Sequence, residues 1–233
     1  NTTLEVIPQI ITNDVDEFLF VAKYVQSLGY KELNWNLGCP YPMVAKCGMG
    51  SGLISNTERI HSILDKVHSE TNIVVSMKMR MGYENASEIL DVFPILEKYP
   101  IKNIAIHARI GKQVYKGDVD LDSFQRCLDV SKHKLYYNGD ITSVEKFKDM
   151  QARFPSIDYF MIGRGLIADP FLPNMIKNNT TKNNDKNIMK IYVLLEVSVL
   201  LSIDNGSVDC IIVFLIDQQK IIIYSLFNLN LIF

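Results

Sequence analysis

Short apolar segments alternate with amphipathic stretches through the first 177 residues of this 233-residue chain. The apolar segments predict buried strands, and the stretches with apolar residues at helical spacing predict helices. The predicted strands cover residues 5–11, 31–37, 72–79, 103–108, 134–137 and 158–162. The predicted helices cover residues 15–28, 57–69, 86–98, 121–131 and 144–153, with a short one near residue 166. Six consecutive strand–helix units of this kind predict a parallel sheet covered by helices.

Polar residues and glycines follow the end of nearly every predicted strand. They are Gln9, Cys39, Lys78, Arg80, His107, Arg109, Asn138, Gly139, Asp140, Gly163 and Arg164. An open doubly wound sheet concentrates its site at one switch point, whereas a (β/α)8 barrel gathers side chains from many strand ends on one face. The sequence therefore predicts an α/β fold of the (β/α)8 TIM-barrel type. A complete barrel needs about 250 residues, so we expect an incomplete one with six units visible and the missing units before Asn1.

The composition changes after residue 177. Residues 1–177 are predicted to form the barrel domain, and 178–187 form a polar linker rich in asparagine and lysine. Residues 188–233 form an apolar tail of low complexity, for which the best local interpretation is a hairpin of 208–216 with 221–227. Lys190 and Glu196 interrupt the apolar run at 188–203, so no membrane span is predicted.

Charge and cysteine usage limit the possible partners. A formal net charge of −2 gives no global attraction to nucleic acid, so a polyanion must meet a local basic patch. The four cysteines form no CxxC pair and no metal-finger spacing, and no signal peptide is recognisable. We expect a cytoplasmic protein without a metal site, monomeric if its barrel is complete.

Two local patterns predict details of the backbone, one around Cys39 and one at a helix start. Gly38 and Pro40 flank Cys39 at a stiff strand exit, and the glycines at 48, 50 and 52 are expected to let the backbone pass close to something flat or bulky. Further along, Thr142 and Glu145 have the spacing of a capping box before the helix at 144–153.

Five motifs together resemble the tRNA-dihydrouridine synthase family, most closely its bacterial branch. They are Asn36-Leu-Gly-Cys-Pro40 with the glycines up to 52, Ser76-Met-Lys-Met-Arg-Met-Gly82, Ile106-His-Ala-Arg109, Tyr137-Asn-Gly-Asp-Ile141 and Met161-Ile-Gly-Arg-Gly165. They follow the family's order over residues 7–171. The resemblance implies FMN-dependent reduction of a uridine C5=C6 bond in tRNA, with NADPH reducing the flavin.

The resemblance also implies roles for individual residues. Hydride transfer to C6 builds enolate-like charge that needs an acid at C5, and the thiol of Cys39 is the candidate. Lys78 would stabilise the reduced flavin, while Gln9 and His107 would contact the flavin or the base. The flavin phosphate would bind Asn138, Gly139, Asp140, Gly163 and Arg164, near the usual phosphate site of such barrels. The tRNA would bind Arg80, Arg109 and Lys112 around the barrel mouth, and the target base must flip out to reach the flavin.

The chain departs from the family pattern at both ends. The family's first strand, with its proline and methionine, is not found before Asn1, and its helical tRNA-binding domain is not recognisable in the tail. An open barrel would leave two strand edges and an apolar interior uncovered, so we expect weak FMN binding. The alternatives are another FMN barrel, such as a dihydroorotate or dihydropyrimidine dehydrogenase, and an inactive fragment of the tRNA enzyme.

Overall fold

Six parallel strands form a curved sheet at the centre of the chain. A computed structural model describes residues 7–181, 198–204, 207–217 and 220–225. The strands are β1 (Gln9–Ile11), β2 (Glu32–Leu37), β3 (Val74–Arg80), β4 (Ile104–His107), β5 (Leu135–Asn138) and β6 (Phe160–Met161). Each pairs in parallel with the next along the chain. The observed strands agree with the six predicted ones, apart from shifts at their ends.

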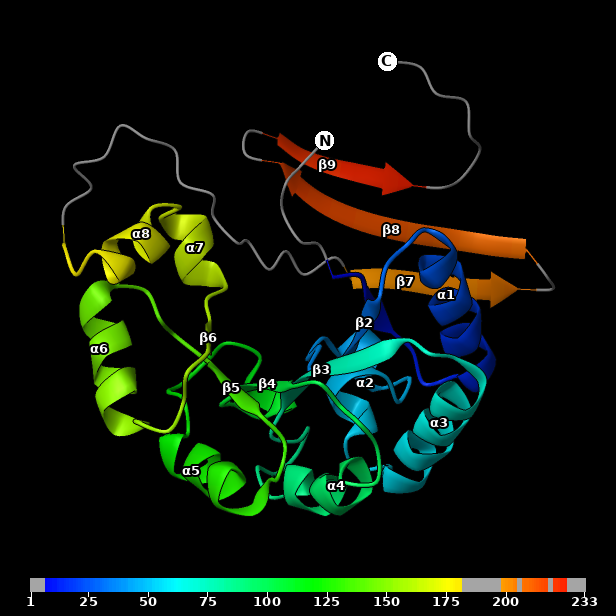
Figure 1. Ribbon diagram of the computed structural model, residues 1–233, viewed down its shortest axis with the longest axis horizontal. Helices are drawn as coiled ribbons and strands as arrows, with labels where there is room; N and C mark the ends of the chain where they lie inside the picture. Colours follow the sequence, from blue (N-terminus) through cyan, green and yellow to red (C-terminus); the bar gives the residue numbers. More distant parts are fainter. Residues whose placement is uncertain (1–6, 182–197, 205–206, 218–219, 226–233) are drawn as a thin grey trace.

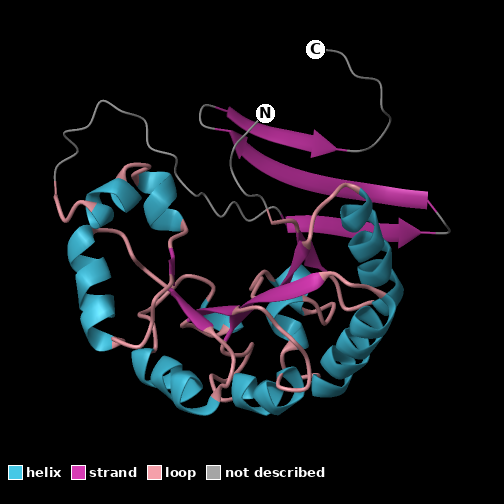
Figure 2. Cartoon of the chain, in the orientation of Figure 1, coloured by secondary structure: helices cyan, strands magenta, loops and turns pink. Residues whose placement is uncertain are grey.

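The longer helices lie on the outer, convex side of this sheet (Figures 1 and 2). The longer ones are α1 (Val15–Ser27), α3 (Thr57–Glu70), α4 (Glu88–Leu96), α5 (Leu121–Val130) and α6 (Val144–Arg153). The shorter ones are α2 (Pro42–Ala45), η1 (Gly50–Leu53), η2 (Gly111–Gln113), α7 (Arg164–Ala168) and α8 (Leu172–Lys177). Alternating strands and helices around an arc confirm the predicted incomplete (β/α)8 barrel.

Side-chain caps explain where several helices begin. Asp14 accepts hydrogen bonds from two first-turn amides of α1, and Asn56 accepts one from the backbone N–H of Arg59 in α3. For α6 the predicted cap at Thr142 is wrong. The helix begins at Val144, as predicted, so its N-cap is the preceding Ser143, whose hydroxyl accepts the N–H of Lys146.

The core lies between the sheet and its helices. Trp35 of β2 is fully buried and packs edge-to-face on Phe18 of α1, with ring centroids 5.3 Å apart. Trp35 therefore points toward the helices. Since side chains alternate along a strand, Asn34 and Asn36 point to the other side, into the barrel. Hydrogen-bonded polar side chains line the interior at this end of the sheet, so the prediction of an apolar interior is wrong here.

The tail adds strands beside β1. Strand β7 (Ser198–Asp204) pairs in parallel with β1, and β8 (Ser207–Asp217) pairs antiparallel with both β7 and β9 (Lys220–Ser225). The β8–β9 pair confirms the predicted hairpin, although residues 226–227 lie outside the described residues. So do 182–187 of the predicted linker. None of the helices in the described part of the chain is long and apolar enough to cross a membrane.

Candidate active site at the carboxyl ends of the strands

The register of the sheet brings the predicted site residues to one end of the barrel. Arg80, the last residue of β3, lies opposite His107, the last residue of β4, and His107 lies opposite Asn138 at the end of β5. Parallel strands present their carboxyl ends on the same face, where barrel enzymes build their active sites. The loops that follow these strands therefore share one face.

Cys39 lies in the loop after β2, and its side chain is partly exposed. The side-chain oxygen of Asn36 accepts the backbone N–H groups of Gly38 and Cys39, both at 2.9 Å. From the other side, Ser51 donates its N–H (3.0 Å) and its hydroxyl (2.8 Å) to the carbonyl of Cys39. The backbone of Cys39 is thus held from two sides while its thiol stays partly accessible.

The glycine-rich run after Cys39 folds back onto the protein itself. A Cβ at Gly50 would lie 2.7 Å from the carbonyl oxygen of Cys39, and one at Gly52 would lie 2.1 Å from the carbonyl oxygen of Ala45. Real side chains do not tolerate such distances. The predicted close approach is therefore to the protein's own backbone, at the Cys39 loop and α2.

A ladder of amides inside the barrel supports Asn36. Its Nδ2 donates to Oε1 of Gln9 (2.8 Å), and Nε2 of Gln9 donates to Oδ1 of Asn34 (2.8 Å). Nδ2 of Asn34 in turn donates to the hydroxyl of Ser76 (2.9 Å). We call Asn36, Gln9, Asn34 and Ser76 the amide ladder. It ties the Cys39 loop to β1 and β3.

Arg80 is buried beneath this loop rather than displayed at the mouth, with 1% of its surface exposed. Its Nε donates to the carbonyl of Gly38 (3.1 Å), and its Nη1 donates to the carbonyl of Ile110 (2.8 Å). Burial lowers the pKa of Arg80 from its usual high value. The guanidinium also lies 5.3 Å from the ring centroid of Tyr115, which holds Arg164 at 4.4 Å.

Arg109 links three predicted site residues and is 2% exposed. Its Nη1 and Nη2 donate to the two carboxylate oxygens of Asp140, at 3.0 and 2.5 Å, and Nη1 also lies 3.1 Å from Nε2 of His107. Arg164 donates to Oδ1 of Asp140 at 2.6 Å. The hydrogen bond from Arg109 is the main reason why the pKa of Asp140 is lowered.

His107 stays uncharged in this setting. Burial, followed by the positive charges of Arg80, Lys78 and Arg109, lowers its pKa to about 2, and Asp140 opposes the shift. The carboxylate of Asp140 is shared by two guanidinium groups, so this cluster carries net positive charge. Such a cluster suits an anionic ligand.

The remaining predicted residues lie around this cluster. Lys78 is half-buried in β3, one step along the same face from Arg80. Nδ2 of Asn138 donates to the carbonyl of Met161 at 2.8 Å, which joins the ends of β5 and β6. Gly163 is exposed, and Lys112 is exposed and paired with Glu84. The structure therefore buries Arg80 and Arg109 and leaves Lys112 at the surface.

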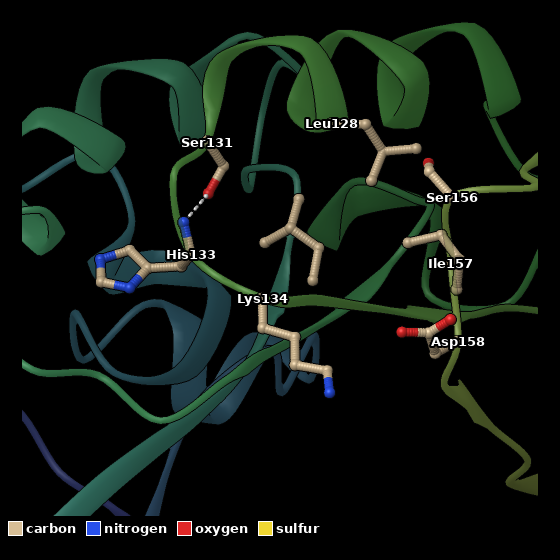
Figure 3. Close-up of a pocket in the computed structure, with 8 residues that line it drawn as sticks. Leu128, Ser131, His133, Lys134, Ser156, Ile157 and Asp158 are labelled. Atoms are coloured by element: carbon tan, nitrogen blue, oxygen red, sulfur yellow. Dashed lines mark hydrogen bonds between the residues drawn. The ribbon is translucent and has the colours of Figure 1, made fainter.

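A small polar cavity of about 160 Å³ lies at the opposite end of the strands (Figure 3). Ser131, His133 and Lys134 line it before and at the start of β5, with Ser156, Ile157 and Asp158 before β6. Chemistry in barrels occurs at the other face, so we assign this cavity no catalytic role. Within the described ranges, no group of three or more His, Cys, Asp or Glu residues is placed to hold a metal ion.

The side chains that hold the Cys39 loop were not among the predicted site residues. Asn36 lies in one of the five family motifs, but no function was predicted for it or for Ser51, Asn34 and Ser76. The signal for three of them was present, because polar residues at 34, 36 and 76 interrupt strands that are otherwise apolar. Buried polar groups need partners, so such interruptions predict an internal hydrogen-bonded network.

The fold and this site define an α/β barrel protein whose catalytic face carries a held thiol and a cationic cluster. A solved structure shares the fold: 2-keto 3-deoxygluconate aldolase from Picrophilus torridus has a TM-score of 0.51 and 12% identity, covering 73% of this chain and 64% of that one. The sequence model of the dihydrouridine synthase (Dus) family matches residues 1–201. The chain belongs to the dihydrouridine synthase family, which confirms the predicted membership.

Individual relatives agree with this membership. The chain is 28% identical to tRNA-dihydrouridine synthase B of Pasteurella multocida over 177 residues, 76% of this chain and 53% of the relative. It is 33% identical to tRNA-dihydrouridine(16) synthase of Pseudomonas syringae over 157 residues, 66% of this chain and 49% of the relative. The chain thus spans about half the length of these relatives.

Proposed function

We propose that this chain carries the catalytic part of an enzyme that reduces the C5=C6 bond of a uridine in tRNA to 5,6-dihydrouridine, with FMN as cofactor and NADPH as reductant. The observation that carries the proposal is Cys39, a partly exposed residue whose backbone is held at the carboxyl ends of the strands, next to Gly38, whose carbonyl binds the buried Arg80. Membership of the dihydrouridine synthase family favours this reaction over that of another FMN barrel. A tRNA substrate favours a cytoplasmic location.

The residues at the site suit a flavin nucleotide. Among the described residues, the buried Nε of Arg109 has no hydrogen-bond partner, so an acceptor on a ligand would satisfy this donor. A Cβ at Gly163 would meet no atom of the described part of the chain within 4 Å, which leaves space beside the positive charge of Arg164. We propose that FMN is held by Gln9, Lys78, His107, Asn138, Gly139, Asp140, Gly163 and Arg164.

Bound FMN, reduced by NADPH, would supply the hydride that C6 of the uracil ring receives. Cys39 would give its thiol proton to C5, so that one hydride and one proton complete the reduction. Asn36 and Ser51 bind the backbone of Cys39, which orients its side chain. Lys78, at the same face, would place positive charge where negative charge develops.

The residues proposed to contact tRNA fall into a buried group and an exposed group. Arg80 and Arg109 lie inside the barrel and bind carbonyl and carboxylate groups, so we propose that they meet the flipped base rather than the tRNA backbone. Lys112 is exposed and suits a phosphate. Tyr115 is 41% exposed between Arg80 and Arg164 and offers a ring on which a base can stack.

The test measures dihydrouridine in unmodified tRNA after incubation with the protein, FMN and NADPH. We expect product from the wild-type chain and from Cys47→Ala, and little product from Cys39→Ala. Cys47 is an exposed thiol near Cys39 in sequence, so its removal is a matched control. Equal product from Cys39→Ala would remove Cys39 from the mechanism.

Two other outcomes would favour the alternatives. Absence of product from every variant, the wild type included, would favour the inactive fragment. Reduction of a free pyrimidine in place of tRNA would favour a dehydrogenase of the dihydroorotate or dihydropyrimidine class.

A further inference from the structure

The ring nitrogen of His107 that contacts Arg109 is Nε2. Nη1 of Arg109 lies 3.1 Å from Nε2 of His107, and both side chains are buried, at 2% and 5% exposure. An arginine guanidinium carries donors and no acceptor, so Nε2 must be the accepting nitrogen of the pair. A neutral imidazole that accepts at Nε2 carries its proton on Nδ1.

Two groups other than His107 hold the guanidinium of Arg109 through three hydrogen bonds. Asp140 takes both terminal nitrogens of Arg109, and the carbonyl of Gly117 accepts Nη2 at 2.6 Å. Because both terminal nitrogens of Arg109 are bound, the guanidinium cannot rotate away from His107 without losing charge-assisted hydrogen bonds. The orientation of Arg109 is therefore set by groups other than His107.

We propose that Arg109 and Asp140, besides their proposed ligand contacts, position His107 and lock it as the Nδ1–H tautomer, so that His107 presents a neutral hydrogen-bond donor to a carbonyl oxygen of the bound cofactor or base. This inference rests on the proposed function for the identity of the acceptor. The tautomer itself is set by protein groups and needs no bound ligand. Burial and the charges of Arg80, Lys78 and Arg109 keep His107 uncharged, which agrees with a neutral donor.

The tautomer is measured directly by ¹⁵N NMR of the full chain labelled at its histidines. The chain has four histidines, and His107→Gln identifies the signals of His107 by their loss. We expect a protonated Nδ1 and an unprotonated Nε2 at neutral pH. A protonated Nε2, or a charged ring at neutral pH, would overturn the proposal whatever the variants do.

Variants then test the lock. Arg109→Lys keeps the charge but loses the fork, and we expect the Nδ1–H to Nε2–H ratio to fall about tenfold as a charge-assisted bond is lost. Asp140→Asn keeps one acceptor, and the ratio should fall by less. Arg164→Gln is the matched control, because Arg164 binds Asp140 without contacting His107, so its ratio should stay at the wild-type value. Folded Arg109→Lys with an unchanged ratio would overturn the lock.

The two proposals fail separately. The NMR signals need neither FMN nor tRNA, so a locked tautomer in a protein that makes no dihydrouridine would count against the proposed function alone. Dihydrouridine formation by a protein whose His107 carries its proton on Nε2 would count against the lock alone.

Discussion

Asn36→Ala should release the Cys39 loop. The substitution removes three hydrogen bonds at a residue that is 4% exposed: those from the amides of Gly38 and Cys39, and the one to Gln9. Each has a net value of about 0.5–1.5 kcal/mol, so the free energy of unfolding should fall by about 2–4 kcal/mol. Two of the three bonds restrain the loop, so local opening should increase at least fivefold, by about 1–3 kcal/mol.

The assay is alkylation by iodoacetamide, followed by mass spectrometry of the cysteine peptides. Cys47 is exposed and serves as the reference thiol in the same molecule. We expect the Cys39 to Cys47 rate ratio to rise at least about fivefold in Asn36→Ala, in line with the increase in opening. Cys127 is buried, and burial raises its pKa to about 12, so it should stay unmodified and report that the protein is folded.

Ser76→Ala is the matched control for this prediction. Ser76 is buried and ends the amide ladder, three hydrogen bonds away from Asn36. Its loss should lower the free energy of unfolding by about 1 kcal/mol and leave the rate ratio unchanged. A folded Asn36→Ala with the wild-type ratio would refute the reasoning, since the loop would then be held by Ser51 and Arg80 without Asn36.

Four further predictions concern the strand-end site. The pKa of His107 is about 2 in the folded state against about 6.5 unfolded, so the unfolded state binds more protons between these values. The free energy of unfolding, measured with urea, should therefore fall as the pH drops below about 6.5. This fall should be steeper in wild type than in His107→Asn, by up to about 1.4 kcal/mol per pH unit. Equal slopes of unfolding free energy against pH would contradict a neutral, buried His107. Gly165→Ala should destabilise by about 2–4 kcal/mol, because its Cβ would lie 2.1 Å from the carbonyl oxygen of Ile141. Gly163→Ala, with open space around its Cβ, should leave stability unchanged and weaken FMN binding in a flavin-fluorescence titration; unchanged binding would move the phosphate site elsewhere. Arg80→Met should cost about 3 kcal/mol in thermal or urea unfolding, because it leaves the carbonyls that Arg80 binds without a donor; a stability equal to wild type would show that water replaces the guanidinium.

Most of the fold follows from the sequence because it depends on local periodicity. The buried faces of the six strands and five longer helices repeat at spacings that any chain of this kind must show. Ends were harder to place, since a cap depends on which of two neighbouring hydroxyls reaches a free amide. Thr142 and Ser143 both qualify by type, and only the backbone geometry selects Ser143.

Part of the site also follows from the sequence, because parallel strands present their carboxyl ends on one face. This rule gathered His107, Arg109, Asp140 and Arg164 correctly into one cluster. It does not say which cations face solvent. Arg109 is internal because Asp140, 31 positions away, lies where its fork can bind, and such a pairing leaves no periodic trace.

The amide ladder has a direction. The backbone N–H groups of Gly38 and Cys39 donate to Asn36, Asn36 to Gln9, Gln9 to Asn34, and Asn34 to Ser76. A backbone N–H cannot become an acceptor, so the loop dictates which way every amide along the ladder is turned. Aligned hydrogen bonds polarise one another. The conformation of the Cys39 loop thus determines the orientation of side chains as far away as β3. If the loop moved, each amide in the ladder could turn its donor and acceptor the other way.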